Sequence, residues 1–171
     1  HGIGRRQRQM CIRDRLGAEE KAYPLHLISN QPKTKLHSQM DNGTLSSSIK
    51  IKGHQPLEMN PDDAKSRGIT QGDIVRVFNG RGSCLCGANI TADVMPGVVI
   101  ISTGSWYDPA EPNDPKSMCK HGNPNVLSPD IGTSKLGQGP AAHSCLVEIE
   151  IYDGPTQDIT AFNPPEIIEK K

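Results

Sequence analysis

Side chains that form hydrogen bonds are concentrated in one long segment, residues 122–136, with the sequence GNPNVLSPDIGTSKL. Asparagine, aspartate, serine and threonine offer mixed donors and acceptors there, whereas few side chains in the segment could form a core. A loop of this length inside a compact domain is usually either functional or disordered. Apolar side chains in and before the segment could pin it to a surface, so we interpret it as an ordered binding loop. These anchors are Trp106, Tyr107, Val126, Leu127, Ile131 and Leu136.

A second polar cluster, His37-Ser38-Gln39, lies where the chain has left a short apolar run at residues 25–29. The run is typical of a buried strand, and Pro32 after it favours a turn or an extended loop. A histidine in a loop is more often solvated than functional. The cluster alone therefore indicates a candidate binding loop and no specific chemistry.

The cysteines allow a different chemistry. Five cysteines at irregular spacing do not suggest a disulfide framework. Cys84 and Cys86 would share one face of a strand, and Cys119 with His121 could complete a metal site. Zinc sites more often contain Cys-x-x-Cys pairs, which favours small buried thiols over a bound metal.

Size and charge limit the class of protein. The 171 residues suit one domain, and 19 basic residues balance 19 acidic ones. This balance argues against nucleic-acid and membrane partners, and no apolar run approaches the roughly 20 residues that span a bilayer. We expect a non-native or disordered leader at 1–15, a linker at 16–22, one domain at 23–153 and a C-terminal tail at 154–171.

The elements that would position these loops are short. Residues 60–68 predict a helix with Asn60 as N-cap, Pro61 in the first turn and Gly68 beyond the end. Asn79-Gly80 between two β-rich runs predicts a hairpin of residues 74–78 and 83–90. Further strands are expected at 98–102 and 145–151, the last with Val147, Ile149 and Ile151 on its packed face. The pattern indicates a small, mainly β barrel with short helices.

Several motifs, in this order, make residues 23–165 resemble the C-terminal cofactor-binding domain of the dimethyl sulfoxide reductase family of molybdenum oxidoreductases. The resemblance implies a double-psi β-barrel of the aspartate-decarboxylase-like type. The motifs are Leu36-His37-Ser38-Gln39, residues 60–64 with 67–69, residues 72–79 with Arg81-Gly82, Trp106-Tyr107 and residues 122–136.

The resemblance also implies a function. The expected ligand is the bis(molybdopterin guanine dinucleotide) molybdenum cofactor, and the expected partners are the remaining domains of a longer enzyme. The tail at 160–163 resembles the S-oxide and N-oxide reductases of the family, those acting on biotin sulfoxide and trimethylamine N-oxide. The chain would then be an inactive fragment, because the family's molybdenum ligand comes from an earlier domain. We expect a cytoplasmic protein, with the periplasm as the alternative.

The resemblance assigns cofactor contacts and no catalytic or metal-ligating residue. Backbone amides in glycine-rich turns can hold a pyrophosphate without positive charge, and carboxamides can pair with a pterin. Asp130 could accept from a guanine or cap a turn, and Thr133 and Ser134 could bind phosphate or cap a helix. At the position of His143 relatives often carry glutamine. The expected contacts are His37, Ser38, Gln39, Asn123, Asn125, Asp130, Thr133, Ser134, Gln138 and His143.

Three alternatives stay open at this level. Trp106 and Tyr107 resemble aromatic residues near the family's substrate funnel, although an aromatic pair more often serves packing. The barrel could be a free-standing module for another nucleotide. It could also be a structural metal-binding domain built on the cysteines and His121.

Overall fold

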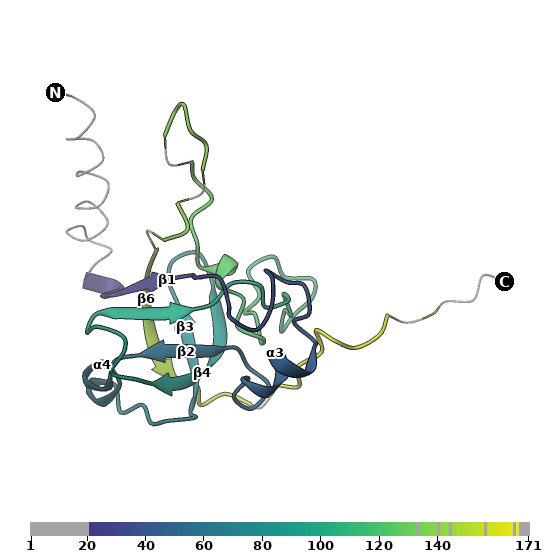
Figure 1. Cartoon of the computed structure of the whole chain (residues 1–171), viewed down its shortest axis with the longest axis horizontal. Helices are drawn as coiled ribbons and strands as arrows, with labels where there is room; N and C mark the ends of the chain where they lie inside the picture. Colours follow the sequence, from purple (N-terminus) through teal and green to yellow (C-terminus); the bar gives the residue numbers. More distant parts are fainter. Residues whose placement is uncertain are drawn as a thin grey trace.

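Six strands close into a barrel around an apolar interior (Figure 1). The computed structural model of the chain describes residues 21–132, 134–139, 141–143, 145–155, 157–165 and 167, so the expected leader and most of the linker lie outside the described residues. In chain order the elements are β1 (Leu25–Ile28), α3 (Thr44–Ser48), β2 (Pro56–Met59), α4 (Pro61–Ser66), β3 (Ile74–Phe78), β4 (Ser83–Ile90), β5 (Val98–Ile101), the 3-10 helix η1 (Pro124–Val126) and β6 (Cys145–Ile151).

The strand order around the barrel is β1-β5-β2-β4-β3-β6. The pairs β1/β5 and β2/β4 are parallel, and the other neighbours are antiparallel. The connection 29–55 joins β1 to β2, and the connection 102–144 joins β5 to β6; neither pair of strands is adjacent in the barrel. These two crossover connections are long and carry the polar loops. The expected mainly β class with short helices, a double-psi barrel, is confirmed.

The core consists of alternate residues of the strands. In β1, β2, β3 and β5 buried and partly exposed residues alternate, as expected for strands with one face on a core. Strand β4 differs, because the residues from Cys84 to Ala88 are all buried. The chain around Cys119 pairs with the first half of β4 through an isolated bridge between Cys84 and Cys119, and the Leu85 amide donates to the Cys119 carbonyl at 2.9 Å. In β6, Val147 and Ile149 are buried as predicted, but Ile151 is 45% exposed, so its predicted place on the packed face is wrong.

Local sequence explains the elements that were predicted. The Asn60 side chain caps α4 by accepting from the Asp62 amide at 2.9 Å, and Gly68 has φ +68° just beyond the helix. The hairpin of β3 and β4 turns at Asn79, whose amide donates to the Gly82 carbonyl at 3.1 Å. Strand β2 and helix α3 were not predicted. Each is only four or five residues long, which leaves little periodicity to detect.

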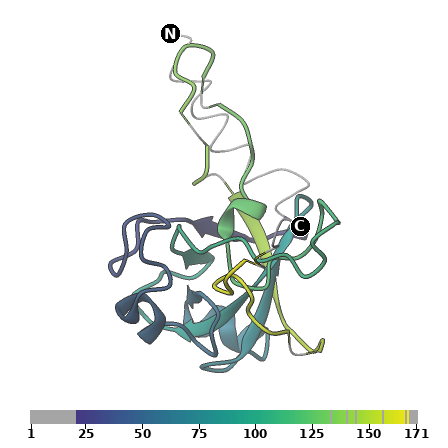
Figure 2. The same cartoon turned by 90° about the vertical axis from the view of Figure 1, so that its right-hand side faces the viewer.

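Residues 128–132, 134–139 and 141–143 belong to an arm that rises from η1 and leaves the barrel in both views (Figures 1 and 2). Leu127 at its base is fully buried, whereas Ile131 is 58% and Leu136 100% exposed. The expectation that these two residues pin the segment to a surface is therefore wrong within this chain. In the described part of the chain, no helix is both long and apolar enough to cross a bilayer.

Candidate functional site

The loops converge at one end of the barrel. In Figure 1 the connection after β1, helix α3, part of the β5–β6 connection and the C-terminal tail gather at the right-hand end, opposite α4. The predicted contacts His37, Ser38 and Gln39 are exposed here. The Gln39 amide donates to the Leu36 carbonyl at 2.9 Å, which closes a tight turn. His37 has φ 50° within it, a left-handed conformation that only the surrounding structure can hold.

Trp106 connects this turn to the start of the second predicted loop. Its indole Nε1–H donates to the Ser38 carbonyl at 2.8 Å, and its backbone amide donates to Asp41 Oδ2 at 3.0 Å. Its carbonyl accepts from His121 Nδ1 at 3.1 Å. Because His121 directly precedes Gly122, Trp106 holds the 36–39 turn and the start of the 122–136 segment at the same end of the barrel.

Two glycines permit this close approach. A Cβ on Gly104, where φ is +92°, would lie 1.8 Å from the His37 carbonyl oxygen. A Cβ on Gly122, where φ is +85°, would lie 2.7 Å from the Cβ of Gln55. Neither position accepts a side chain without a shift of the backbone or of a buried neighbour. The two loops are thus fixed against the barrel by contacts that only glycine allows.

A buried charge cluster lies beneath these loops, and we define it as Lys35, Asp41, Lys50 and His121. Asp41 Oδ1 accepts from Lys35 Nζ at 2.5 Å and from Lys50 Nζ at 2.9 Å. The side chains of these two lysines are only 1% and 4% exposed, and that of Asp41 is fully buried. Lys35 Nζ also donates to Gln55 Oε1 at 3.2 Å. Burial this deep is tolerated because each charged group has polar partners.

The hydrogen bonds of His121 define its protonation state. Nδ1–H donates to the Trp106 carbonyl, so Nε2 is the acceptor for Lys50 Nζ at 2.7 Å. Burial, reinforced by the Lys50 charge, lowers the pKa of His121 from 6.5 to about 4. Burial also lowers the pKa of Lys50, opposed by the Asp41 carboxylate. Burial alone would raise the pKa of Asp41, but bonds from Lys35, Lys50 and Trp106 outweigh it and lower that pKa.

The charge cluster therefore has an excess of positive charge. Two ammonium groups share one carboxylate, and His121 is neutral. Among the residues that the structure describes, Asp41 is the only acid within 4.0 Å of either ammonium. The sequence suggested anion binding without positive charge, because the whole chain is neutral. Lys35, Asp41 and Lys50 were not recognised as site residues, and no spacing motif links them to His121, which lies 71 residues after Lys50.

The remaining predicted contacts do not meet at this point. The Asn123 side chain caps η1 by accepting from the Asn125 amide at 2.9 Å, which leaves the Asn125 side chain exposed on that helix. Asp130, Ser134, Gln138 and His143 are exposed on the arm, and Thr133 lies outside the described residues. Ser134 closes its own turn, since its hydroxyl accepts from the Gly137 amide at 2.7 Å. These arm residues remain predicted contacts.

The cysteines are arranged as core residues. Cys84, Cys86 and Cys119 are completely buried, and the Cys84 and Cys86 sulfurs are 4.0 Å apart. Burial raises the pKa of Cys119 and, together with a hydrogen bond to Cys86, that of Cys84, so these groups are held as thiols. The His121 ring faces Lys50 and Trp106 instead. Within the described ranges no three His, Cys, Asp or Glu residues are grouped as metal ligands.

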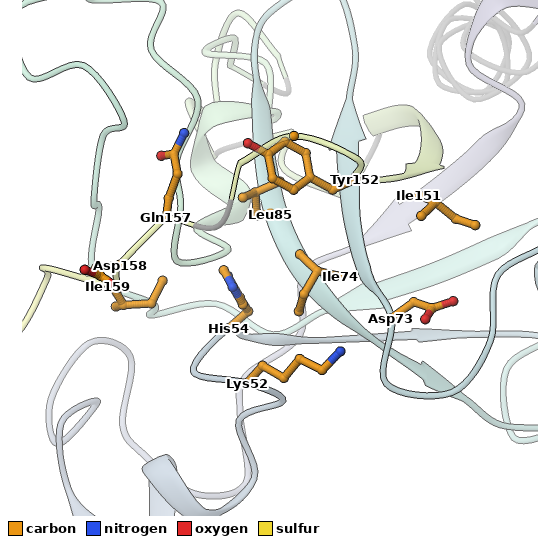
Figure 3. Close-up of a pocket in the computed structure, with 11 residues that line it drawn as sticks. Lys52, His54, Asp73, Ile74, Leu85, Ile151, Tyr152, Gln157, Asp158 and Ile159 are labelled. Carbon is orange, nitrogen blue, oxygen red and sulfur yellow. The ribbon is translucent and has the colours of Figure 1, made fainter.

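Two cavities lie near the loops. One of about 450 Å³ lies between the barrel and the C-terminal tail, and none of the predicted contacts lines it (Figure 3). His54 and Lys52 face Tyr152 and the tail across it. A second cavity of about 430 Å³ lies beside η1, with Arg81, Tyr107 and Val126 in its wall. Tyr107 is 47% exposed there, and Val126, which directly follows Asn125, lines the same cavity.

The closed barrel with polar loops fixed over one end defines a ligand-binding domain, and comparison with known proteins identifies its family. A family model described as "Molydopterin dinucleotide binding domain" matches residues 25–146. The chain belongs to this family of molybdopterin-binding domains. The family resemblance read from the motifs is confirmed.

Three curated relatives are named as N-oxide or sulfoxide reductases. The chain is 50% identical over 150 residues to trimethylamine-N-oxide reductase of Salmonella typhimurium, and the match covers 87% of this chain and 18% of the relative. It is 44% identical over 153 residues to dimethyl sulfoxide/trimethylamine N-oxide reductase of Cereibacter sphaeroides, covering 90% and 19%. It is 48% identical over 138 residues to biotin sulfoxide reductase of the same species, covering 81% and 18%. The chain thus spans less than a fifth of the length of these relatives.

A solved structure supports the fold. Acetylene hydratase from Pelobacter acetylenicus superposes with a TM-score of 0.62 at 18% sequence identity, covering 78% of this chain and 19% of that one. At this identity the likeness shows that the barrel is shared and carries no further conclusion.

Proposed function

We propose that this chain is the domain of a molybdenum-dependent S-oxide or N-oxide reductase that holds the bis(molybdopterin guanine dinucleotide) cofactor. The longer protein is called the parent reductase below. The observation that carries the proposal is the joining of the 36–39 turn to His121-Gly122 through Trp106, above a buried cluster with excess positive charge. It is supported by membership of the molybdopterin-binding family and by relatives that reduce such substrates.

The residues present fit this anionic, hydrogen-bonding ligand. The unbalanced ammonium of the charge cluster favours an anion over this end of the barrel, because burial limits its screening by water. His37, Ser38 and Gln39 are exposed, and Asn125 offers an exposed carboxamide on η1. Such groups pair with the mixed donors and acceptors of a pterin or a guanine.

The arm completes the proposed site only within the parent reductase. Its predicted contacts Asp130, Ser134, Gln138 and His143 are exposed. Ile131 and Leu136 of the arm are 58% and 100% exposed, and two large apolar side chains exposed on one segment suit burial against another domain. In the proposal the arm reaches a different part of the same cofactor from the one held at the barrel end.

This chain's role is binding and orientation. When bound, the cofactor supplies oxygen-atom transfer at molybdenum, whose protein ligand we place in another domain of the parent reductase. The described residues hold the dinucleotide, keep His121 neutral and keep the 36–39 turn in one conformation. The choice between sulfoxide and N-oxide substrates belongs to the whole reductase.

Cofactor content of the purified parent reductase tests the proposal. We expect two guanine nucleotides per molybdenum in the wild type. The double variant His37→Ala/Asn125→Ala should lose most of the molybdenum and keep the thermal unfolding of the 171-residue chain nearly unchanged. Lys65→Ala, an exposed change on α4 at the opposite end, is the control and should retain full content.

Two results would overturn the proposal. A guanine content of zero or one per molybdenum contradicts the bis(guanine dinucleotide) form. Full molybdenum content in the double variant contradicts the assignment of these two residues, whereas unfolding of that variant would make them structural.

A further inference from the structure

The C-terminal tail is fastened to the barrel at its loop end, and we name residues Thr160, Ala161 and Phe162 the strap. Asp108, which is 4% exposed, accepts three hydrogen bonds from it. Asp108 Oδ2 accepts from the Thr160 amide at 2.6 Å and from the Ala161 amide at 3.1 Å, and Oδ1 accepts from the Thr160 hydroxyl at 2.6 Å. A carboxylate that accepts several bonds from one segment fixes the path of that segment.

Lys120 holds the same segment from a second side. Its Nζ donates to the Asp158 carbonyl at 2.9 Å and to the Thr160 hydroxyl at 3.1 Å, and it lies 3.4 Å from Asp108 Oδ1. Lys120 is itself buried and directly precedes His121. The strap is therefore anchored on residues that flank the candidate site.

The anchored strap places Phe162 against the charge cluster. The Phe162 ring packs edge to face on Trp106, with ring centroids 5.2 Å apart, and on His121 at 5.0 Å. Lys50 Nζ lies 5.3 Å from the centre of the same ring. One side chain thus contacts the indole that holds the Ser38 carbonyl and covers both the ammonium and the imidazole beneath it.

We propose that Phe162 is a positioning residue for the cofactor loop 36–39, acting through the Trp106 indole. This inference rests on the proposed function. Trp106 is 38% exposed, so the packing of Phe162 on its indole removes freedom that this partly open side chain would otherwise have. Loss of the ring would free the indole to leave Ser38, and the strained turn at His37 would then sample other conformations before cofactor binds.

Trp106 is the single tryptophan of the chain, so its fluorescence reports on this contact directly. An edge-to-face aromatic pair shifts an equilibrium by about two- to tenfold. We therefore expect Phe162→Ala to raise acrylamide quenching of Trp106 by about twofold or more, and Phe162→Tyr to restore the wild-type value. Phe78→Leu is the matched control, because it removes the other phenylalanine, which packs on Tyr23 and Arg76.

The second readout is molybdenum retention by the parent reductase. Phe162→Ala should lower it severalfold at equal thermal stability, Phe162→Tyr should rescue it and Phe78→Leu should leave it unchanged. If Phe162→Ala does not fold, Asp108→Asn, which keeps the shape of the anchor, takes its place with the same expected changes.

The outcomes separate this inference from the proposed function. Unchanged quenching in Phe162→Ala, or increased quenching with wild-type molybdenum content, overturns the positioning role and leaves the proposed function intact. Equal losses in Phe78→Leu and Phe162→Ala reduce Phe162 to a general structural role and also overturn it. A wild-type parent reductase without molybdenum overturns the proposed function itself.

Discussion

At the scale of single residues, the most consequential feature is one carboxylate shared by two buried lysines. Asp41 accepts from both ammonium groups and from the Trp106 amide. Removing one member of such a group is costly, because the others stay buried without a counter-charge. The charge cluster therefore supports the fold near the candidate site while leaving a net positive charge under the 36–39 turn.

Replacing Asp41 by alanine should lower the free energy of unfolding by about 3–5 kcal/mol, because Lys35 and Lys50 lose their shared carboxylate. Urea denaturation of the chain measures this loss. Adding Lys50→Met in the same chain should recover part of it, as expected for coupled residues. A loss below about 1 kcal/mol, the size of an exposed ion pair, would contradict this description of the charge cluster.

His121 should make stability depend on pH. Its folded pKa of about 4 lies below the ordinary value of 6.5, so between these values the unfolded chain binds more protons than the folded one. The contribution of His121 to the free energy of unfolding is fully present above pH 6.5. It falls by on the order of 3 kcal/mol as the pH drops toward 4. Asp41 titrates below this window, because its pKa is lowered from 3.8.

Burial also lowers the pKa of His54, which adds a slope of the same sign. Comparing the wild type with His121→Gln isolates the contribution of His121. Thermal unfolding measured from pH 7 to pH 4 should show a flatter dependence in the variant. An unchanged slope would assign the acid sensitivity to other groups.

At the scale of elements, glycines decide how closely the loops approach the barrel. Gly97 and Gly104 both have a positive φ, of 80° and 92°. A Cβ on Gly97 would meet no atom within 4 Å, whereas one on Gly104 would collide with the His37 carbonyl. Comparing substitutions at these two glycines therefore separates the cost of backbone strain from the cost of a steric clash.

Gly97→Ala should destabilise the chain by about 1–2 kcal/mol, the cost of a left-handed alanine. Gly104→Ala should cost at least about 2 kcal/mol more, because the 36–39 turn must move. Urea midpoints of the two variants give the difference. Equal midpoints would mean that the turn yields without cost and does not hold a fixed conformation.

The sequence predicts elements whose signals are local. The Asn60 cap, the turn at Asn79 and the alternation in β6 each lie within a few residues, and the structure contains all three. The alternation ends at Ile151 because the burial of this residue depends on which segments cover the barrel. A local sequence pattern does not contain that information. The charge cluster could not be predicted for a similar reason, since its members are joined only by the fold.

At the scale of the whole molecule, the crossover connections bring the residues of the candidate site to one end of a closed barrel. The long connections 29–55 and 102–144 each join strands that are not adjacent in the barrel, and they carry the turn at 36–39, the charge cluster and η1. The family motifs predicted the fold and the ligand class. They did not predict that the arm stands apart from the turn. The hydrogen bonds of the Ser134 and Gln138 side chains are formed within the arm, with Gly137 and Lys135.

The most direct test is amide hydrogen exchange of the parent reductase with and without its cofactor. We predict that bound cofactor slows exchange in residues 36–39 and 121–127 and leaves the cavity beside Lys52, His54 and Tyr152 unchanged. Slower exchange confined to that cavity, with residues 36–39 and 121–127 as in the cofactor-free protein, would contradict the proposed site.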